Sequence, residues 1–217
     1  MQVSDRIGLP NIQSVCQKLF EEYKVRTLLD LGGGGNPLAY LCNTLDIHRL
    51  NVDLAEPESS TFLTRTANIN ITDFDSIEMA LLEFFGNIKI DAVIMIQSIE
   101  HLTKDEGLNV LQRLDKWASK LIIVETPNGF VFQEPLESNP WQEHLSGWKK
   151  KDFMSAGFKV RGTQGLKILK QDKNKGAYRF RFRGLRFIDV LLSRMLFTSR
   201  FPSLSYNLCA VKIVKQQ

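Results

Sequence analysis

Residues 26–37 read RTLLDLGGGGNP, and this stretch decides the fold. An apolar, β-prone run over residues 27–29 ends at an acid, Asp30, and four consecutive glycines lead into a helix-compatible stretch that starts at Pro37. α/β proteins present backbone to nucleotide-like ligands where a strand ends and the chain turns through glycine. Glycine has no Cβ and tolerates positive φ, so the main chain can approach a ligand closely. The stretch therefore predicts a ligand-binding strand-to-helix turn.

Strand-like and helix-like segments alternate around this turn. Their periodicity predicts further strands at 48–54, 65–71, 90–96 and 121–124, and helices at 10–23, 38–45, 73–85 and from Thr103 to Trp117. Such alternation is typical of an α/β, Rossmann-like, doubly wound sheet, which binds ligands at the carboxyl ends of its strands. The expected ends carry polar residues or glycine: Asp30–Gly35, Asp53, Asn68–Asn70, Gln97–His101 and Glu125–Asn128.

Beyond residue 127 the pattern changes. A Pro-, Asn- and Gly-containing loop over 127–147 is long enough to act as a lid. A short helix is expected at 148–156, a strand at 158–162, a polar turn at 172–176 and a last strand at 204–214, antiparallel to the one near 160. We therefore expect one domain over 1–217 with a seven-stranded, mostly parallel sheet and a helical insertion, at 185–197, before the last strand.

Charge is distributed unevenly along the chain. Residues 1–144 contain 11 Lys/Arg and 21 Asp/Glu, a balance of −10, whereas residues 145–217 contain 17 Lys/Arg and 3 Asp/Glu, a balance of +14. A basic carboxy-terminal third favours an anionic partner, although a solvated basic face explains it equally well. Three separated cysteines, no signal peptide and no run of 18 apolar residues predict a cytoplasmic protein without disulfides or a zinc site.

The glycine stretch resembles the first motif of class I S-adenosylmethionine-dependent methyltransferases, D-x-G-x-G-x-G. Asp30, Gly32 and Gly34 match this motif, and Asn36 stands at its third glycine. A nicotinamide-binding motif would need a glycine at Pro37, and no Lys-Ser/Thr pair follows as in nucleoside triphosphate sites. The alternative is a tight structural turn without a ligand.

The resemblance implies S-adenosylmethionine as cofactor and S-adenosylhomocysteine as product. Asp53 lies about 20 residues past the glycines, where a carboxylate can accept both ribose hydroxyls. Asp30 corresponds to the acid that organises the methionine end, and Asn68 to an Asp that contacts adenine; capping of the next helix by Asn68 and Asn70 is the alternative. The expected cofactor-binding residues are Asp30, Gly32, Gly33, Gly34, Asp53, Leu54, Asn68, Ile69 and Gln97.

Three further motifs are similar to a bacterial and archaeal branch of these methyltransferases: Glu100-His101-Leu102, Thr126–Gly129 and His144–Trp148. We expect Glu100, His101 and His144 at the catalytic centre, with His101 as candidate general base. Some relatives hold a divalent ion with a Glu-x-x-Glu-His cluster. Here Gln97, a weaker ligand, replaces the first carboxylate. No metal is therefore expected, and a three-ligand site of Glu100, His101 and His144 is the alternative.

The predicted function is methyl transfer from S-adenosylmethionine to a small-molecule acceptor, which can be lipid-linked. Residues 1–127 would bind the cofactor, and residues 128–217 would face the acceptor. A basic amphipathic helix at 185–197 would either contact an anionic membrane surface, making the protein peripheral, or pack over the sheet edge. RNA methylation, suggested by the alternating residues 178–183, and a non-catalytic cofactor-binding scaffold are the alternatives.

Overall fold

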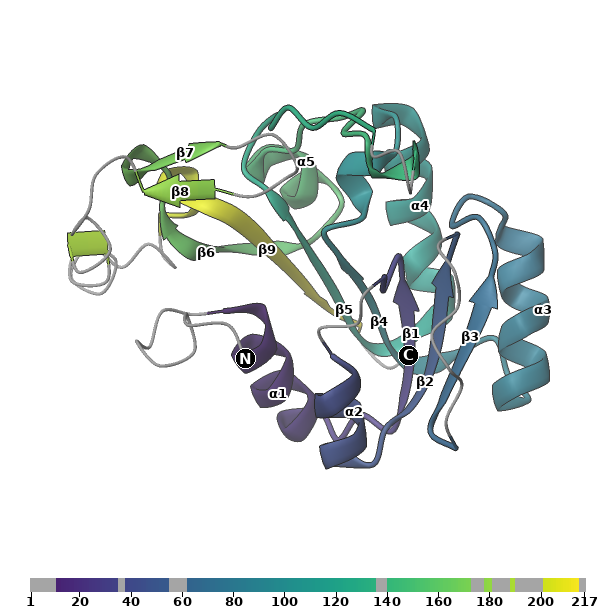
Figure 1. Cartoon of the computed structure of the whole chain (residues 1–217). Helices are drawn as coiled ribbons and strands as arrows, with labels where there is room; N and C mark the ends of the chain where they lie inside the picture. Colours follow the sequence, from purple (N-terminus) through teal and green to yellow (C-terminus); the bar gives the residue numbers. More distant parts are fainter. Residues whose placement is uncertain are drawn as a thin grey trace.

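The computed structural model describes residues 11–34, 38–54, 62–135, 140–172, 178–180, 188–189 and 201–214. A seven-stranded sheet with the order β3-β2-β1-β4-β5-β9-β6 forms the centre of the molecule (Figure 1). The first five strands are parallel, and β9 runs antiparallel to both of its neighbours. The strands are β1 (Thr27–Leu31), β2 (His48–Asp53), β3 (Thr64–Asn68), β4 (Ile90–Ile96), β5 (Ala118–Pro127), β6 (Lys159–Leu166) and β9 (Ser205–Ile213). This arrangement confirms the predicted α/β, Rossmann-like, mostly parallel sheet.

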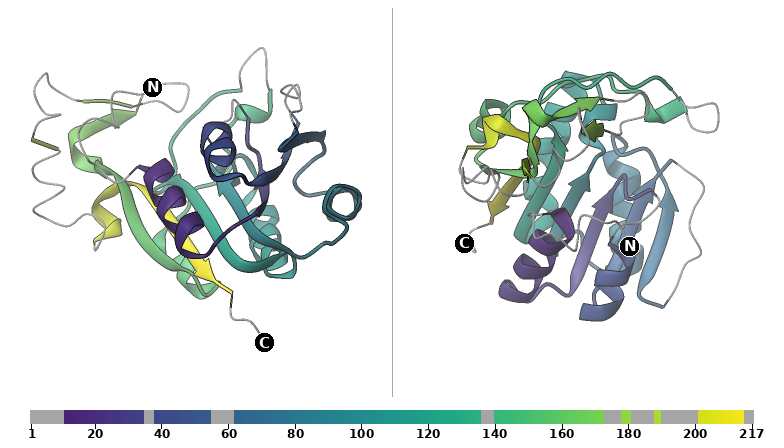
Figure 2. Two further views of the ribbon diagram at one scale, coloured as in Figure 1. Left: turned by 90° about the horizontal axis from the view of Figure 1, so that it is seen from below. Right: turned by 60° about the vertical axis from the view of Figure 1, so that its left-hand side comes forward.

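Helices cover both faces of the sheet (Figure 2). α1 (Ile12–Glu22) and α2 (Ala39–Leu45) pack on one face against strand residues such as Leu28 and Ile94. α3 (Phe74–Phe85), α4 (Lys104–Trp117) and α5 (Lys150–Ser155) pack on the other face against Leu29, Leu31 and Val93. Neighbouring strand residues point to opposite faces, so the nearly all-apolar β4 buries side chains in both cores.

The starts of three helices are encoded locally. Thr103 and Glu106 form the predicted capping box of α4, in which the Glu106 carboxylate accepts from the Thr103 amide at 2.9 Å. Asn11 caps α1 by accepting from the Ser14 amide, and Asp73 caps α3 by accepting from the Ser76 amide. Asp73, rather than Asn68 or Asn70, therefore caps the helix after β3.

Two core positions that the helical spacing of apolar residues predicts are wrong; this spacing predicts buried stripes of Phe74, Ile77, Leu81, Leu82 and Phe85 in α3 and of Leu108, Leu111, Leu114 and Trp117 in α4. Leu82 of α3 is 52% exposed and Leu108 of α4 is 36% exposed. α4 instead buries Gly107 and Val110 beside the expected Leu111, Leu114 and Trp117. The burial at position 107 reflects long-range packing, because a Cβ on Gly107 would lie 2.4 Å from the Trp148 ring, which occupies that space.

The carboxy-terminal part adds antiparallel structure. β9 pairs with β6, as predicted, and both β5 and β6 are longer than expected. β7 (Lys170–Asp172) and β8 (Tyr178–Phe180) form a hairpin around the expected polar turn, whose central residues 173–177 lie outside the described residues. Short 3-10 turns complete the chain: η2 (Ile99–His101), η3 (Pro140–Gln142), η4 (Lys167–Leu169) and η5 (Pro202–Leu204).

Some expectations fall outside the described residues. Residues 188–189 are helical, but the rest of the segment 185–197, and with it the amphipathic membrane helix, is not described; the same holds for Asn36 and Pro37. In the described part of the chain, no helix is long and apolar enough to span a bilayer. Cys16, Cys42 and Cys209 are free thiols buried in the protein.

Candidate functional site

Hydrogen bonds connect the glycine turn after β1 to the ends of β2 and β4. The Gly32 amide donates to the Val52 carbonyl at 2.7 Å, and the Ser98 hydroxyl donates to the Gly32 carbonyl at 3.1 Å. Gly32 has a φ of +74°, and a Cβ there would lie 2.4 Å from the Ser98 oxygen. Only glycine fits this position without displacing Ser98. The turn is therefore held at the point where the strand order reverses between β1 and β4, the place where such sheets bind ligands.

A buried ion pair lies beneath the turn. Asp30 Oδ2 accepts from Arg49 Nε at 2.9 Å and from a terminal nitrogen of the same guanidinium at 2.6 Å. The two side chains are 2% and 0% exposed. A Cβ on Gly33 would lie between 2.2 and 2.7 Å from atoms of Asn51, Arg49 and Asp30, so the pair and its neighbour fill the space under the backbone. Arg49 thus neutralises Asp30 and supports the turn from below.

Asp53 follows at the end of β2. Its Oδ2 accepts from the Gly34 amide at 2.7 Å, and its side chain borders a cavity with Leu54. A carboxylate with one oxygen on the turn and an opening beside it can accept a ligand hydroxyl. Asp53 therefore lies where the sequence predicts the ribose-binding acid.

The loop after β3 contributes different residues from those expected. Asn68 is exposed, and its side-chain amide lies 3.5 Å from the Leu54 carbonyl. The cavity is lined instead by Asn70, Ile71 and Thr72. The Asn70 side-chain oxygen accepts from the Thr72 amide at 3.0 Å and from its hydroxyl at 2.9 Å, which fixes this short turn at the cavity edge.

Gln97 and Ser98 follow β4. Gln97 has a φ of +53°, an unusual conformation for a residue with a side chain. Its side-chain amide donates to Glu125 Oε2 at 3.2 Å, and Glu125 also accepts from the Thr163 hydroxyl at 2.6 Å. Burial raises the pKa of Glu125, while these hydrogen bonds oppose the rise. A buried polar network thus holds Gln97 at the cavity.

These elements enclose a cavity of about 180 Å³. Four of the predicted cofactor-binding residues line it, namely Gly32, Asp53, Leu54 and Gln97, together with His101 of the predicted catalytic group. Asp30, Gly33, Gly34, Asn68 and Ile69 lie beneath or beside it. The sequence assigns no individual role in the site to the remaining lining residues: Asn70, Ile71, Thr72, Ser98, Leu102, Glu106, Trp141, Gln142 and Leu145. Asn70 and Ser98 lie within the predicted stretches Asn68–Asn70 and Gln97–His101, and Trp141, Gln142 and Leu145 lie in the predicted 127–147 loop.

Glu100, His101 and His144 form a compact group beside this cavity, as predicted. One potential ligand atom from each lies within 4.8 Å of the other two. Glu100 is buried, and its Oε2 accepts from the Thr126 hydroxyl at 2.8 Å. Its Oε1 is buried without a hydrogen-bond partner in the described part of the chain. Burial raises the pKa of Glu100 to about 8.

The two histidines are oriented by backbone carbonyls. His101 Nδ1 lies 2.9 Å from the Glu143 carbonyl, and His144 Nδ1 lies 2.7 Å from the Val131 carbonyl. Burial lowers the pKa of both rings, which favours the neutral form. A neutral ring that donates from Nδ1 has a lone pair on Nε2, so both rings can accept a proton or bind a cation.

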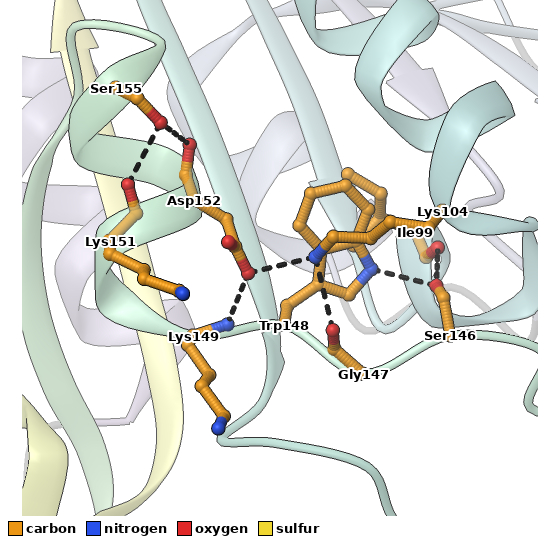
Figure 3. Close-up of polar contacts among 9 residues, drawn as sticks. All are labelled: Ile99, Lys104, Ser146, Gly147, Trp148, Lys149, Lys151, Asp152 and Ser155. Carbon is orange, nitrogen blue, oxygen red and sulfur yellow. Dashed lines mark hydrogen bonds and ion pairs between the residues drawn. The ribbon is translucent and has the colours of Figure 1, made fainter.

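The His144–Trp148 segment, HLSGW, follows this group, and Figure 3 shows the polar contacts of its last three residues. Trp148 is fully buried, and its indole nitrogen donates to the Ser146 hydroxyl at 2.9 Å. Lys104 lies over the indole ring at 3.5 Å and bonds to Asp152 Oδ2 at 2.8 Å and to the Gly147 carbonyl at 3.0 Å. The amides of Leu145 and Ser146 donate to the Glu100 carbonyl. Trp148 therefore packs in the core and does not line the cavity, and the network anchors the residues that follow His144.

Comparison with known proteins places this geometry in a common fold. No family model and no curated protein matches the sequence. A methyltransferase from Archaeoglobus fulgidus described as SAM-dependent matches with a TM-score of 0.54 and 16% identity, covering 93% of this chain and 94% of that chain. The methyltransferase domain of bacterial CtHen1 matches with a TM-score of 0.52 and 16% identity, covering 94% and 97%.

A third solved structure is 1,6-didemethyltoxoflavin-N1-methyltransferase from Burkholderia thailandensis. It matches with a TM-score of 0.55 and 12% identity, covering 94% of this chain and 78% of that chain, and it contains S-adenosylhomocysteine. At these identities the likeness concerns the fold. The chain has the fold of class I S-adenosylmethionine-dependent methyltransferases, as its first motif predicts.

Proposed function

We propose that this protein is a methyltransferase that binds S-adenosylmethionine in the cavity at the carboxyl ends of β1, β2 and β4. The observation that carries the proposal is the joint position of the Gly32–Gly34 turn and the Asp53 carboxylate at one end of this cavity. Asp53 would accept the ribose hydroxyls, and the glycine backbone would face the methionine end. Residues up to 127 would form the cofactor-binding half, and those from 128 the acceptor-side half.

Asp30 has an indirect role in this proposal. Its carboxylate is buried and neutralised by Arg49, and it does not line the cavity. It would therefore fix the glycine turn through Arg49 rather than contact the cofactor. Asn70 and Thr72 lie on the cavity wall instead of Asn68, so we assign the polar contacts of the adenine side to them.

The acceptor would enter beside Glu100, His101 and His144, under the 127–147 loop. Trp141, Gln142 and Leu145 of this loop line the cavity, which supports its role as a cover. In the reaction, a lone pair on the acceptor attacks the methyl carbon, and the carbon–sulfur electron pair stays on sulfur. The products are the methylated acceptor and the neutral thioether S-adenosylhomocysteine; a hydroxyl acceptor also loses its proton. Protein groups contribute by aligning the two reactants.

Proton removal is one use of the Glu100, His101 and His144 group. His101 lines the cavity and has a depressed pKa, so at neutral pH its ring is in the form that accepts a proton. The second use is to hold a divalent cation, in place of the expectation of no metal, and two observations support it. Glu100 Oε1 is buried without a hydrogen-bond partner among the described residues, and both imidazoles are turned by carbonyls that bond to Nδ1.

Glu100, His101 and His144 would hold the cation, which would polarise an acceptor oxygen and so favour its deprotonated form. Titration with Co²⁺, followed by its visible absorption, tests this use. We expect binding to the wild type and a loss of at least 10-fold in affinity in Glu100→Gln and in His144→Gln. Unchanged Co²⁺ binding in both variants would leave proton transfer as the role of His101.

The acceptor we favour is a small molecule, with a lipid-linked compound as one form of it. Two alternatives to this function are RNA methylation and a non-catalytic, cofactor-binding scaffold. The cofactor is tested by calorimetric titration with S-adenosylmethionine and S-adenosylhomocysteine, with NAD as control. We expect micromolar binding of the two sulfur compounds and none of NAD. Binding of NAD alone would point to an oxidoreductase, and binding of none of the three by folded protein would contradict the proposal.

A further inference from the structure

A second pocket opens on the acceptor side of the sheet, and it is basic. Its volume is about 600 Å³, and four lysines line it together with Asn128, Gly129, Met154 and Ser203: Lys149, Lys150, Lys151 and Lys167. None of these described lining residues is acidic. None of the ion pairs in the described ranges of the chain involves these four lysines. The pocket therefore concentrates positive charge, and none of its described lining residues balances that charge.

The acidic residue next to these lysines in the sequence, Asp152, makes its hydrogen bonds with other groups. Asp152 Oδ2 accepts from Lys104 Nζ and from the backbone amide of Lys149, both at 2.8 Å. Figure 3 shows Lys104 lying across the Trp148 ring, whereas the side chain of Lys149 extends away from it. The run Lys149–Lys151 is expected to be the solvated start of a helix, and the fold sets these three lysines around a hollow with Lys167.

Hydrogen bonds hold the backbone around Asn128 and Gly129, which line the pocket. The side-chain nitrogen of Asn128 can donate to the carbonyls of Pro202, Ser203 and Ser205, which lie 2.9–3.1 Å away. The Asn128 carbonyl accepts from Lys167 Nζ, and the Gly129 amide donates to the Trp148 carbonyl at 2.7 Å. Three segments that are distant in sequence thus meet at Asn128, so the lysines are presented by a fixed frame rather than by a single surface helix.

The pocket is joined to the Glu100, His101 and His144 group by a few residues. Thr126 bonds to Glu100, Gly129 lines the pocket, and the Val131 carbonyl orients His144. Two residues of chain span at most about 7 Å. The pocket and this group are therefore close along the chain, and the inference below requires the acceptor to reach from one to the other.

We propose that this lysine pocket binds the phosphate or diphosphate group of the methyl acceptor, an inference that rests on the proposed function. Lysine ammonium groups bind phosphate as point charges, and a phosphomonoester carries a charge of about −1.5 to −2 at pH 7. Several lysines around one hollow match such a multiply charged, compact group. Single-stranded RNA is less well matched, because stacking of bases needs aromatic side chains and none lines the pocket among the described residues.

The test uses inorganic pyrophosphate as probe and the full chain in calorimetry at low salt. The variant Lys149→Gln/Lys151→Gln removes two pocket charges, and Lys18→Gln/Lys89→Gln removes two exposed charges outside the pocket as a matched control. We expect the pocket variant to bind pyrophosphate at least 10-fold more weakly and the control to bind it like the wild type. Lys167→Gln provides a second pocket variant and should weaken binding in the same direction.

Several outcomes would overturn the inference: no pyrophosphate binding by the wild type, equal weakening in the pocket and control variants, or length-dependent RNA binding with which pyrophosphate does not compete.

Anionic phosphatidylglycerol vesicles distinguish the sources of the phosphate. Vesicle binding that pyrophosphate displaces indicates a lipid headgroup, and its absence indicates a free phosphorylated molecule. Titration of the same variants with S-adenosylmethionine separates the two proposals. The lysine substitutions should leave the affinity for the cofactor unchanged. A wild type that binds pyrophosphate in the pocket but does not bind the cofactor would contradict only the proposed function.

Discussion

The parallel half of the sheet and the carboxy-terminal, antiparallel part of the chain each have a buried ion pair, and the two pairs differ in chemistry. In the parallel half, Arg49 binds Asp30 at 2.6 Å under the glycine turn. In the antiparallel part, Lys170 at the start of β7, a strand of the separate two-stranded sheet, lies 3.4 Å from Asp189, whose Oδ1 also accepts from the Leu166 amide at 2.7 Å. The guanidinium stays charged at all relevant pH values, whereas burial lowers the pKa of Lys170 to about 8.

The difference between the two cations indicates two uses of a buried ion pair. Arg49 gives the cofactor side a permanent cation in a bidentate contact between adjacent strands, which suits a turn that must keep its shape around a ligand. Lys170 ties the helical residues 188–189 to the turn after β6 through a weaker contact with a titratable amine. We therefore expect the parallel half to depend more on its pair, and the antiparallel part to respond more to pH.

The largest expected effect is on stability. Arg49→Met would leave the Asp30 carboxylate buried without its cation, and we expect the free energy of unfolding to fall by about 3–5 kcal/mol. Lys170→Met should cost less, because burial already disfavours the Lys170 ammonium, whose pKa falls to about 8, and because Asp189 keeps the hydrogen bond from the Leu166 amide. Urea denaturation measures both. Lys116→Met, which breaks a half-exposed pair with Glu78, is the control and should change stability by less than about 1 kcal/mol. Equal losses for Arg49 and Lys170 would remove the distinction between the two parts.

The next effect is on pH dependence. The folded-state pKa of Lys170, about 8, lies below the unfolded value near 10.5, so between these values the unfolded chain binds more protons. Stability should therefore rise with pH across this window, and the rise relative to Lys170→Met should reach at most about 3 kcal/mol. Denaturation of both proteins from pH 7 to pH 10.5 checks this. Parallel curves would show that Lys170 does not titrate in this way.

The smallest of the three effects concerns the cofactor. Asp53→Ala should weaken S-adenosylmethionine binding by roughly 1.5–3 kcal/mol if the carboxylate bonds to the ribose. Asp75→Ala, an exposed acid in the first turn of α3, is the control and should leave the dissociation constant unchanged. Calorimetry on the two variants measures the difference. An unaltered constant for Asp53→Ala would remove this residue from the binding site.

Much of the fold could be predicted from local patterns. The apolar run of β4, the capping box at Thr103 and the acid after β2 are short-range signals, and they place the strands of the sheet and the start of α4 correctly. Asp53, Gln97 and His101 line the cavity as expected because they follow strands whose ends the pattern defines.

Other parts of the site depend on contacts between distant segments. Trp141 and Leu145 reach the cavity from a loop without periodicity, and the Lys170–Asp189 pair joins segments that no local rule connects. The shift from Asn68 to Asn70 follows from where β3 ends, and strand ends are the least defined part of any pattern. Arg49 did leave a signal, because a charged residue inside an apolar strand requires a buried partner.

The most direct test of the central claim is a crystal structure of the protein with S-adenosylhomocysteine. Our account predicts the ligand in the cavity between the Gly32–Gly34 turn and Gln97, with its ribose hydroxyls on Asp53 and its sulfur on the side of His101. A ligand bound elsewhere, or one in this cavity whose ribose does not contact Asp53, would contradict it.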